Sequence, residues 1–172
     1  NEEFFPAIEN YPHTPFKASR LNHHYAHALS TEIIHDDLKG HIIIDGFGDL
    51  NQAVTIIKKD KLIKVLRVSE YESLGQLYSM TGEKEFQIKA GHPEDVAGKL
   101  MGLQSYGRID TDFYKTLNHF TFENIREVFS PSLFVDFKKN ETLAGLEKLS
   151  WMATIHKKTG SLIVDYFKKF FK

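Results

Sequence analysis

Two hydrophobic periods alternate along the chain, and the shorter one predicts a small β-sheet. A β-branched run at residues 41–45 lies between Gly40 and Gly46 and predicts a buried strand. Residues 52–58 and 62–68 alternate between apolar and polar positions, with a polar turn between them. Together the three runs predict an antiparallel three-strand meander.

The longer period, near 3.6 residues, predicts helices around this sheet. The expected helices cover residues 22–32, 70–82, 94–103, 111–117 and 141–171. Gly82 is expected to end the second, and Pro93 to open the third. Residues 1–20 and 118–140 read as irregular segments. The fold class is therefore α/β or mixed α+β, with a long C-terminal helix.

Three histidines fall within five residues of the first predicted helix. His23 and His27 are four residues apart, so their side chains leave one helical face one turn apart and can share a divalent metal. His24 points to a different face. Asn22 is expected to cap the helix. Ordinary surface histidines also produce this spacing by chance, so the rest of the chain has to support the metal interpretation.

The first strand runs directly into a glycine turn, which is the second candidate for chemistry. Asp45, Gly46 and Gly48 lie where backbone N–H groups can approach a phosphate closely, although Asp-Gly also marks a simple hairpin turn. Further along, Lys99 and Gly102 belong to a glycine-containing stretch. A lysine there can supply charge to a phosphate or carboxylate, or simply face solvent.

The composition of the chain limits the partners and metal ligands that can be expected. Lys and Arg number 22 against 23 Asp and Glu, so nucleic acid is not the expected partner. Cysteine is absent, so any metal ligands are His, Asp or Glu. No apolar run approaches the roughly 20 residues of a membrane helix, and the start of the chain is acidic rather than basic. We therefore expect a soluble, cytoplasmic protein with no membrane partner.

Four stretches in one order resemble the O-carbamoyltransferase family, of the NodU and cephamycin or tobramycin carbamoyltransferase type. They are residues 22–28 (NHHYAHA), 43–49 (IIDGFGD), 73–79 (SLGQLYS) and 99–107 (KLMGLQSYG). The corresponding family patterns are HHxAHA, a strand with DGxG, SLGxLYS and KxMGLAxYG. Residues 21–107 carry the resemblance, and residues 108–172 match only in general layout.

This resemblance implies part of an actin-like (ASKHA) ATPase-type domain. The family makes carbamoyl-adenylate from carbamoyl phosphate and ATP and transfers the carbamoyl group to a hydroxyl of a small molecule such as a sugar or antibiotic. The resemblance implies that His23 and His27 are ligands of iron or a similar divalent metal, and that His24 lies beside the substrate as a catalytic group. The resemblance places Asp45, Gly46 and Gly48 at the phosphate side of the nucleotide, and Lys99 and Gly102 at its wall.

Several family features are absent from residues 1–172, which we expect to be one fragment of the actin-like domain. The N-terminal strands, the C-terminal half with its third metal ligand, and the carbamoyl-activating domain are missing. The fragment is therefore expected to be inactive alone and to bind metal weakly, and its apolar end favours a homo-oligomer. A non-catalytic metal- or nucleotide-binding actin-like module remains an alternative, as does another reaction such as tRNA modification.

Overall fold

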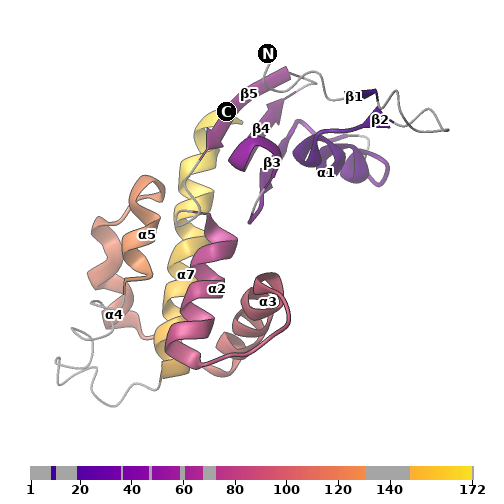
Figure 1. Cartoon of the computed structure of the whole chain (residues 1–172). Coiled ribbons are helices and arrows are strands. Elements are labelled where there is room, and N and C mark those ends of the chain that lie inside the picture. Colours follow the sequence, from indigo (N-terminus) through magenta and orange to yellow (C-terminus); the bar gives the residue numbers. More distant parts are fainter. Residues whose placement is uncertain are drawn as a thin grey trace. The chain divides into compact units, whose positions relative to one another are not determined.

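The computed structural model describes residues 9–10, 19–35, 37–46, 48–58, 61–67, 73–130 and 148–171. The chain divides into two compact units, residues 1–74 and 75–172. Figure 1 labels the elements of both units. The architecture is a mixture of helix and strand, as the two hydrophobic periods predict.

A three-strand antiparallel sheet forms the centre of the first unit. Its strands are β3 (His41–Ile44), β4 (Gln52–Lys58) and β5 (Lys61–Arg67), in the order β3-β4-β5. The predicted meander is thus confirmed. Within the lead-in that the sequence predicts to be irregular, β1 (Glu9–Asn10) pairs with β2 (Ser19–Arg20). Unlike the fully buried strand expected from its β-branched run, β3 leaves Ile42 39% exposed.

Helix α1 (His23–Glu32) packs on the sheet through an apolar contact. Ala28 from the helix joins Ile43 of β3 and Ile57 of β4 in one buried cluster. The predicted cap is confirmed, because the Asn22 side chain accepts a hydrogen bond from the Tyr25 amide at 3.2 Å. This packing determines which helical face meets the sheet and which faces remain for chemistry.

The second unit is helical, and its longest helix is α7 (Lys148–Phe167). The other helices are α2 (Leu74–Phe86), α3 (Pro93–Leu103), α4 (Thr111–Thr116) and α5 (Ile125–Val128). Short 3-10 turns are η1 (Asp49–Asn51) in the first unit and η2 (Gln104–Tyr106), η3 (Leu117–His119), η4 (Phe122–Asn124) and η5 (Lys168–Phe170) in the second. Trp151, Met152 and Ile155 of α7 are fully buried, so the apolar face of this helix belongs to the core.

The end of the second predicted helix differs from the prediction. Gly82 lies inside α2, which continues to Phe86 and ends before Gln87, a residue with a left-handed backbone (φ 55°). The glycine is buried because Val96 of α3 occupies the space that a side chain would need. Part of the predicted final helix, residues 141–147, lies outside the described residues, as do residues 131–140 of the segment predicted to be irregular.

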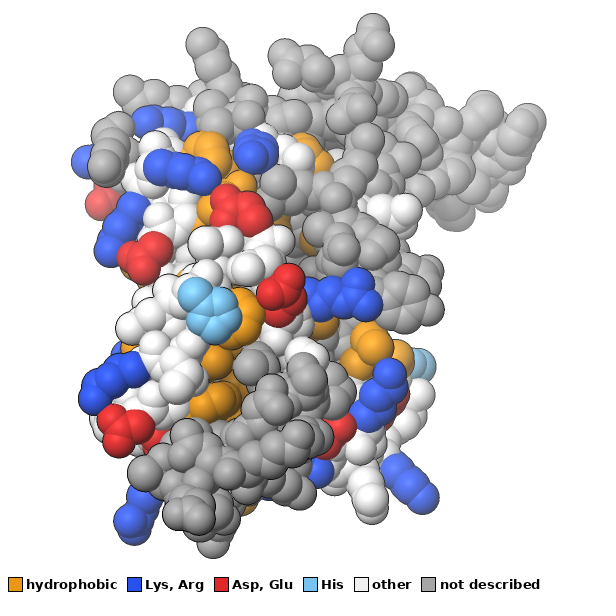
Figure 2. All heavy atoms as spheres, turned by 90° about the vertical axis from the view of Figure 1, so that its left-hand side faces the viewer, with side chains coloured by type: hydrophobic (Ala, Val, Ile, Leu, Met, Phe, Trp, Pro, Cys, Tyr) orange, Lys and Arg blue, Asp and Glu red, His pale blue; other side chains and the backbone are white. Residues whose placement is uncertain are grey.

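The surface carries charges of both signs. On the face drawn in Figure 2, lysine and arginine side chains are interspersed with aspartate and glutamate. Among the described residues, none of the helices combines the length and the apolar composition that crossing a bilayer requires.

Candidate metal centre

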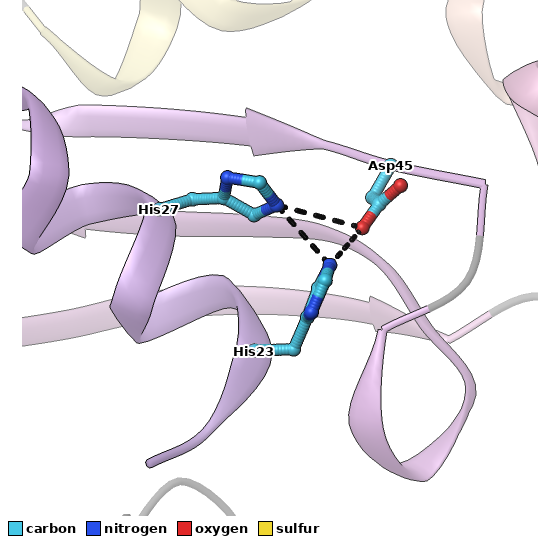
Figure 3. A group of neighbouring side chains, drawn as sticks. All are labelled: His23, His27 and Asp45. Carbon is cyan, nitrogen blue, oxygen red and sulfur yellow. Dashed lines mark hydrogen bonds and ion pairs between the residues drawn. The ribbon is translucent and has the colours of Figure 1, made fainter.

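Three potential metal ligands converge where the first turn of α1 meets the end of β3. The Nε2 atoms of His23 and His27 lie 3.1 Å apart, so the two rings meet on one face as their spacing predicts. Asp45 follows the last residue of β3, and its Oδ2 lies 2.5 Å from His23 Nε2 and 3.8 Å from His27 Nε2. Figure 3 shows both rings and the carboxylate pointing toward one another.

The distances between these donor atoms fit one divalent ion after a small adjustment. Two ligand atoms about 2.1 Å from one ion, at tetrahedral or octahedral angles, lie roughly 3.0–3.4 Å apart. The two imidazole nitrogens already have this separation. The His23–Asp45 contact is shorter than this because it is a hydrogen bond, and the His27–Asp45 distance is a few tenths of an ångström longer. A side-chain adjustment of this size is sufficient for an ion to bind.

One short hydrogen bond and one close nitrogen–nitrogen contact join this group. A carboxylate only accepts, so His23 Nε2 must carry the proton that bonds Asp45 Oδ2. The same nitrogen then has no lone pair to accept a hydrogen bond from His27 Nε2, although the two atoms are 3.1 Å apart. A cation in place of the proton would satisfy both nitrogens and the carboxylate together.

The backbone orients the Asp45 carboxylate. The Gly46 amide donates to Asp45 Oδ1 at 2.6 Å, which leaves Oδ2 directed at the two histidines. Hydrogen bonds to the outer oxygen of a metal-binding carboxylate are a common way of holding the ligand in place. The side chains of His23, His27 and Asp45 are 47%, 54% and 28% exposed, so an ion and its further ligands can reach them.

The His24 side chain leaves α1 on a different face from His23 and His27 and is buried against the sheet. Its exposed fraction is 0%, and its Nδ1 lies 2.6 Å from Thr55 Oγ1 of β4. Burial lowers the pKa of the His24 imidazole. Nε2 has no hydrogen-bond partner within the described part of the chain. A substrate could reach Nε2 only if neighbouring groups moved, so the catalytic role implied by the family resemblance stays a prediction.

The glycine turn uses its N–H groups internally. Gly46 donates to Asp45, and Gly48 donates to the Gln52 carbonyl at 2.8 Å. Binding of a phosphate through these two amides would therefore require the turn to open. Gly48 has another role in this arrangement, because a Cβ there would lie 2.6 Å from His24 Cδ2. The turn consequently packs on the buried histidine.

Lys99 and Gly102 lie on α3, which belongs to the second unit. The three residues of the metal group belong to the first unit. Lys99 is exposed, and its Nζ donates to the Lys89 carbonyl at 3.2 Å. Gly102 is exposed, with nothing within 4 Å of the position of a Cβ. Their assignment to a nucleotide wall remains an implication of the family resemblance.

Sequence reasoning assigned Asp45 to phosphate and did not identify it as a metal ligand. The signal was present in the element lengths, because α1 and β3 are successive elements of similar length joined by residues 33–40. About 15 Å of helix and about 13 Å of strand run in opposite directions, which brings the end of β3 level with the start of α1. The prediction of weak metal binding assumed two protein ligands, whereas three potential ligand side chains lie together here.

Comparisons of this chain with known protein families, with curated proteins and with solved structures give no match. The interpretation of the site therefore rests on its own geometry and on the four sequence motifs.

Proposed function

We propose that this chain binds a divalent metal ion through His23, His27 and Asp45. The observation that carries the proposal is the convergence of one atom from each side chain, all three within 4.8 Å of one another. Three protein ligands on an exposed surface leave coordination positions for water or substrate, as in catalytic rather than structural metal sites. Two imidazoles and a carboxylate suit several ions, including zinc and iron, and the family resemblance favours iron.

The reaction that we propose for the parent protein is ATP-dependent carbamoyl transfer. Carbamoyl phosphate and ATP would yield carbamoyl-adenylate, and the carbamoyl group would pass to a hydroxyl of a sugar or an antibiotic. This proposal, with its actin-like fold, is supported by the order of the four motifs and by the metal group within the first two. A metal ion bound there would polarise a carbonyl or lower the pKa of a coordinated hydroxyl.

A second candidate is a non-catalytic actin-like module that binds metal or nucleotide. The burial of His24 favours it, because a ring that is 0% exposed cannot take a proton from a substrate without rearrangement. The internal hydrogen bonds of Gly46 and Gly48 favour it as well. Both candidate functions include the metal group, and they differ in whether a reaction is catalysed beside it.

Metal binding is tested by titrating the chain with Co²⁺, whose visible spectrum reports ligands and geometry, and with Fe²⁺ and Zn²⁺. We expect His27→Ala and Asp45→Asn each to weaken binding by about tenfold or more, because each removes one ligand atom. His35→Ala is the matched control, since this exposed histidine follows α1 in the same unit and lies outside the group. Equal affinity in wild type and both ligand variants would refute the assignment.

Carbamoyl transfer is tested by incubating the full-length parent protein with carbamoyl phosphate, ATP and a panel of sugars. A carbamoylated sugar detected by mass spectrometry, and lost in His27→Ala, supports the enzyme. Metal binding without any product in the panel supports the non-catalytic module.

A further inference from the structure

Asp49 contacts the backbone of His23, one of the proposed metal ligands. Its Oδ2 accepts a hydrogen bond from the His23 amide at 2.7 Å. His23 is the first residue of α1, so its N–H has no acceptor within the helix. A carboxylate at this end also interacts favourably with the helix dipole.

Asp49 and Asp45 belong to the same short turn. The turn is closed by two backbone hydrogen bonds, from Asp45 to the Ala53 carbonyl at 2.9 Å and from Gly48 to the Gln52 carbonyl at 2.8 Å. Asn51, at the end of η1, has a left-handed backbone with φ 59°. These bonds hold the backbone of the turn at Asp45 and at Gly48, the residue before Asp49.

This turn therefore holds His23 at two points. Asp49 binds its backbone N–H, while Asp45 binds its ring at Nε2. The first contact fixes the start of α1 against the turn, and the second then fixes the ring. Without the first contact, the start of α1 would still be held to the sheet by the Asn22–Gln52 and His24–Thr55 hydrogen bonds, but the His23 backbone could shift relative to Asp45 although all three ligand side chains would remain.

We propose that Asp49 is a positioning residue for His23, acting on the metal group without being a ligand. The inference rests on the proposed metal-binding function. It differs from ordinary helix capping, which would stabilise α1 with no effect on the ring. Asp110 provides the comparison, since its Oδ1 accepts from the Asp112 and Phe113 amides at the start of α4 in the second unit.

The experiment compares Asp49→Ala, Asp49→Asn, Asp49→Glu and the control Asp110→Ala. The first readout uses metal-free protein, in which ¹⁵N signals of the His23 imidazole report the Nε2–H bond to Asp45. The second readout is Co²⁺ affinity. We expect Asp49→Ala to give the His23 ring the signals of an unbound imidazole and to weaken Co²⁺ binding about 10- to 100-fold. Asp110→Ala should change neither.

The two conservative variants separate the alternatives. Asn keeps an oxygen acceptor, so Asp49→Asn should retain most of the affinity; a loss as large as that of Asp49→Ala would make Asp49 a ligand and overturn the inference. Glu keeps the charge but displaces it by one methylene. Asp49→Glu should therefore fold and bind Co²⁺ more weakly than wild type. This variant tests the inference if Asp49→Ala does not fold.

Failure of the inference is distinguishable from failure of the proposed function. Wild-type Co²⁺ binding with unchanged affinity and unchanged His23 imidazole signals in Asp49→Ala would overturn the inference alone. A wild-type protein that binds no Co²⁺, Fe²⁺ or Zn²⁺ would overturn the metal function, and the metal-free imidazole signals would then decide whether Asp49 positions His23.

Discussion

His24 of α1 and Thr55 of the central strand form a buried pair, with His24 Nδ1 2.6 Å from Thr55 Oγ1 and both residues 0% exposed. The pair lies beside the apolar contact of Ala28 with Ile43 and Ile57. His24 and Ala28 are one helical turn apart, and so are His23 and His27. One row of side chains thus docks α1 on the sheet, which leaves the neighbouring row to meet Asp45.

Loss of the Thr55 hydroxyl should destabilise the first unit. Thr55→Val keeps the size and the β-branching but leaves His24 Nδ1 without a partner, at a cost of about 1–3 kcal/mol in the free energy of unfolding. Thr55→Ser keeps the hydroxyl and should cost less. Hydrogen exchange of the β4 amides measures both variants, and equal protection in the two would show that the hydroxyl is not what matters.

Alanine should be tolerated at Gly46 and not at Gly48. A Cβ at Gly48 would lie 2.6 Å from His24 Cδ2 and 2.9 Å from the Gln52 carbonyl oxygen, whereas none of the described residues comes within 4 Å of one at Gly46. Overpacking of this kind costs about 1–3 kcal/mol. Gly48→Ala should therefore lower the midpoint of urea unfolding followed by circular dichroism, and Gly46→Ala should leave it nearly unchanged. The reverse order would contradict the packing of the turn on His24.

Acid should weaken the second unit through His156. Its Nδ1 lies 2.7 Å from the Tyr78 hydroxyl, and burial lowers the pKa of the imidazole below its ordinary value of 6.5. Burial raises the pKa of Tyr78, so the phenol keeps its proton and can donate a hydrogen bond to Nδ1 of neutral His156. Because the folded pKa lies below the unfolded one, this stability is complete above about pH 6.5 and falls as the pH drops through the folded pKa.

The comparison protein for this prediction is His156→Gln, which can accept the Tyr78 hydrogen bond but does not titrate. Trp151, the single tryptophan, is buried in the same helix and reports unfolding of the second unit by fluorescence. Between pH 7.5 and pH 5, wild type should lose more free energy of unfolding than His156→Gln. A difference that stays constant over this range would exclude His156 as the titrating group.

Two helix glycines should respond in opposite directions to alanine. At Gly82 of α2 a Cβ would lie 2.6 Å from Val96 Cγ1, so Gly82→Ala should destabilise the second unit by about 1–3 kcal/mol. At Gly160 of α7 no atom of the described residues lies within 4 Å of a Cβ position, and Gly160→Ala should stabilise by roughly 0.5–1 kcal/mol because alanine favours helix. Trp151 fluorescence in urea measures both. Stabilisation by both substitutions would mean that α2 and α3 do not pack closely at Gly82.

The local elements could be predicted because local rules govern them. Asn22 as a cap, the meander over β3, β4 and β5, and Pro93 at the start of α3 all follow from side-chain chemistry and periodicity within a few residues. The meeting of the His23 and His27 rings follows in the same way from helical geometry. Gly82 was placed wrongly because its packing partner, Val96, lies on another helix.

The assignment of chemistry to faces depended on tertiary contacts. From the spacing, His24 could have faced either a substrate or a core, and docking on Thr55 buried it. Asp45 could have faced a phosphate, but the antiparallel run of β3 beside α1 brought its carboxylate to the two histidines. Periodicity specifies which side chains share a face, whereas the neighbour of that face is specified only when the elements pack, because burial of Ala28, Ile43 and Ile57 selects one arrangement.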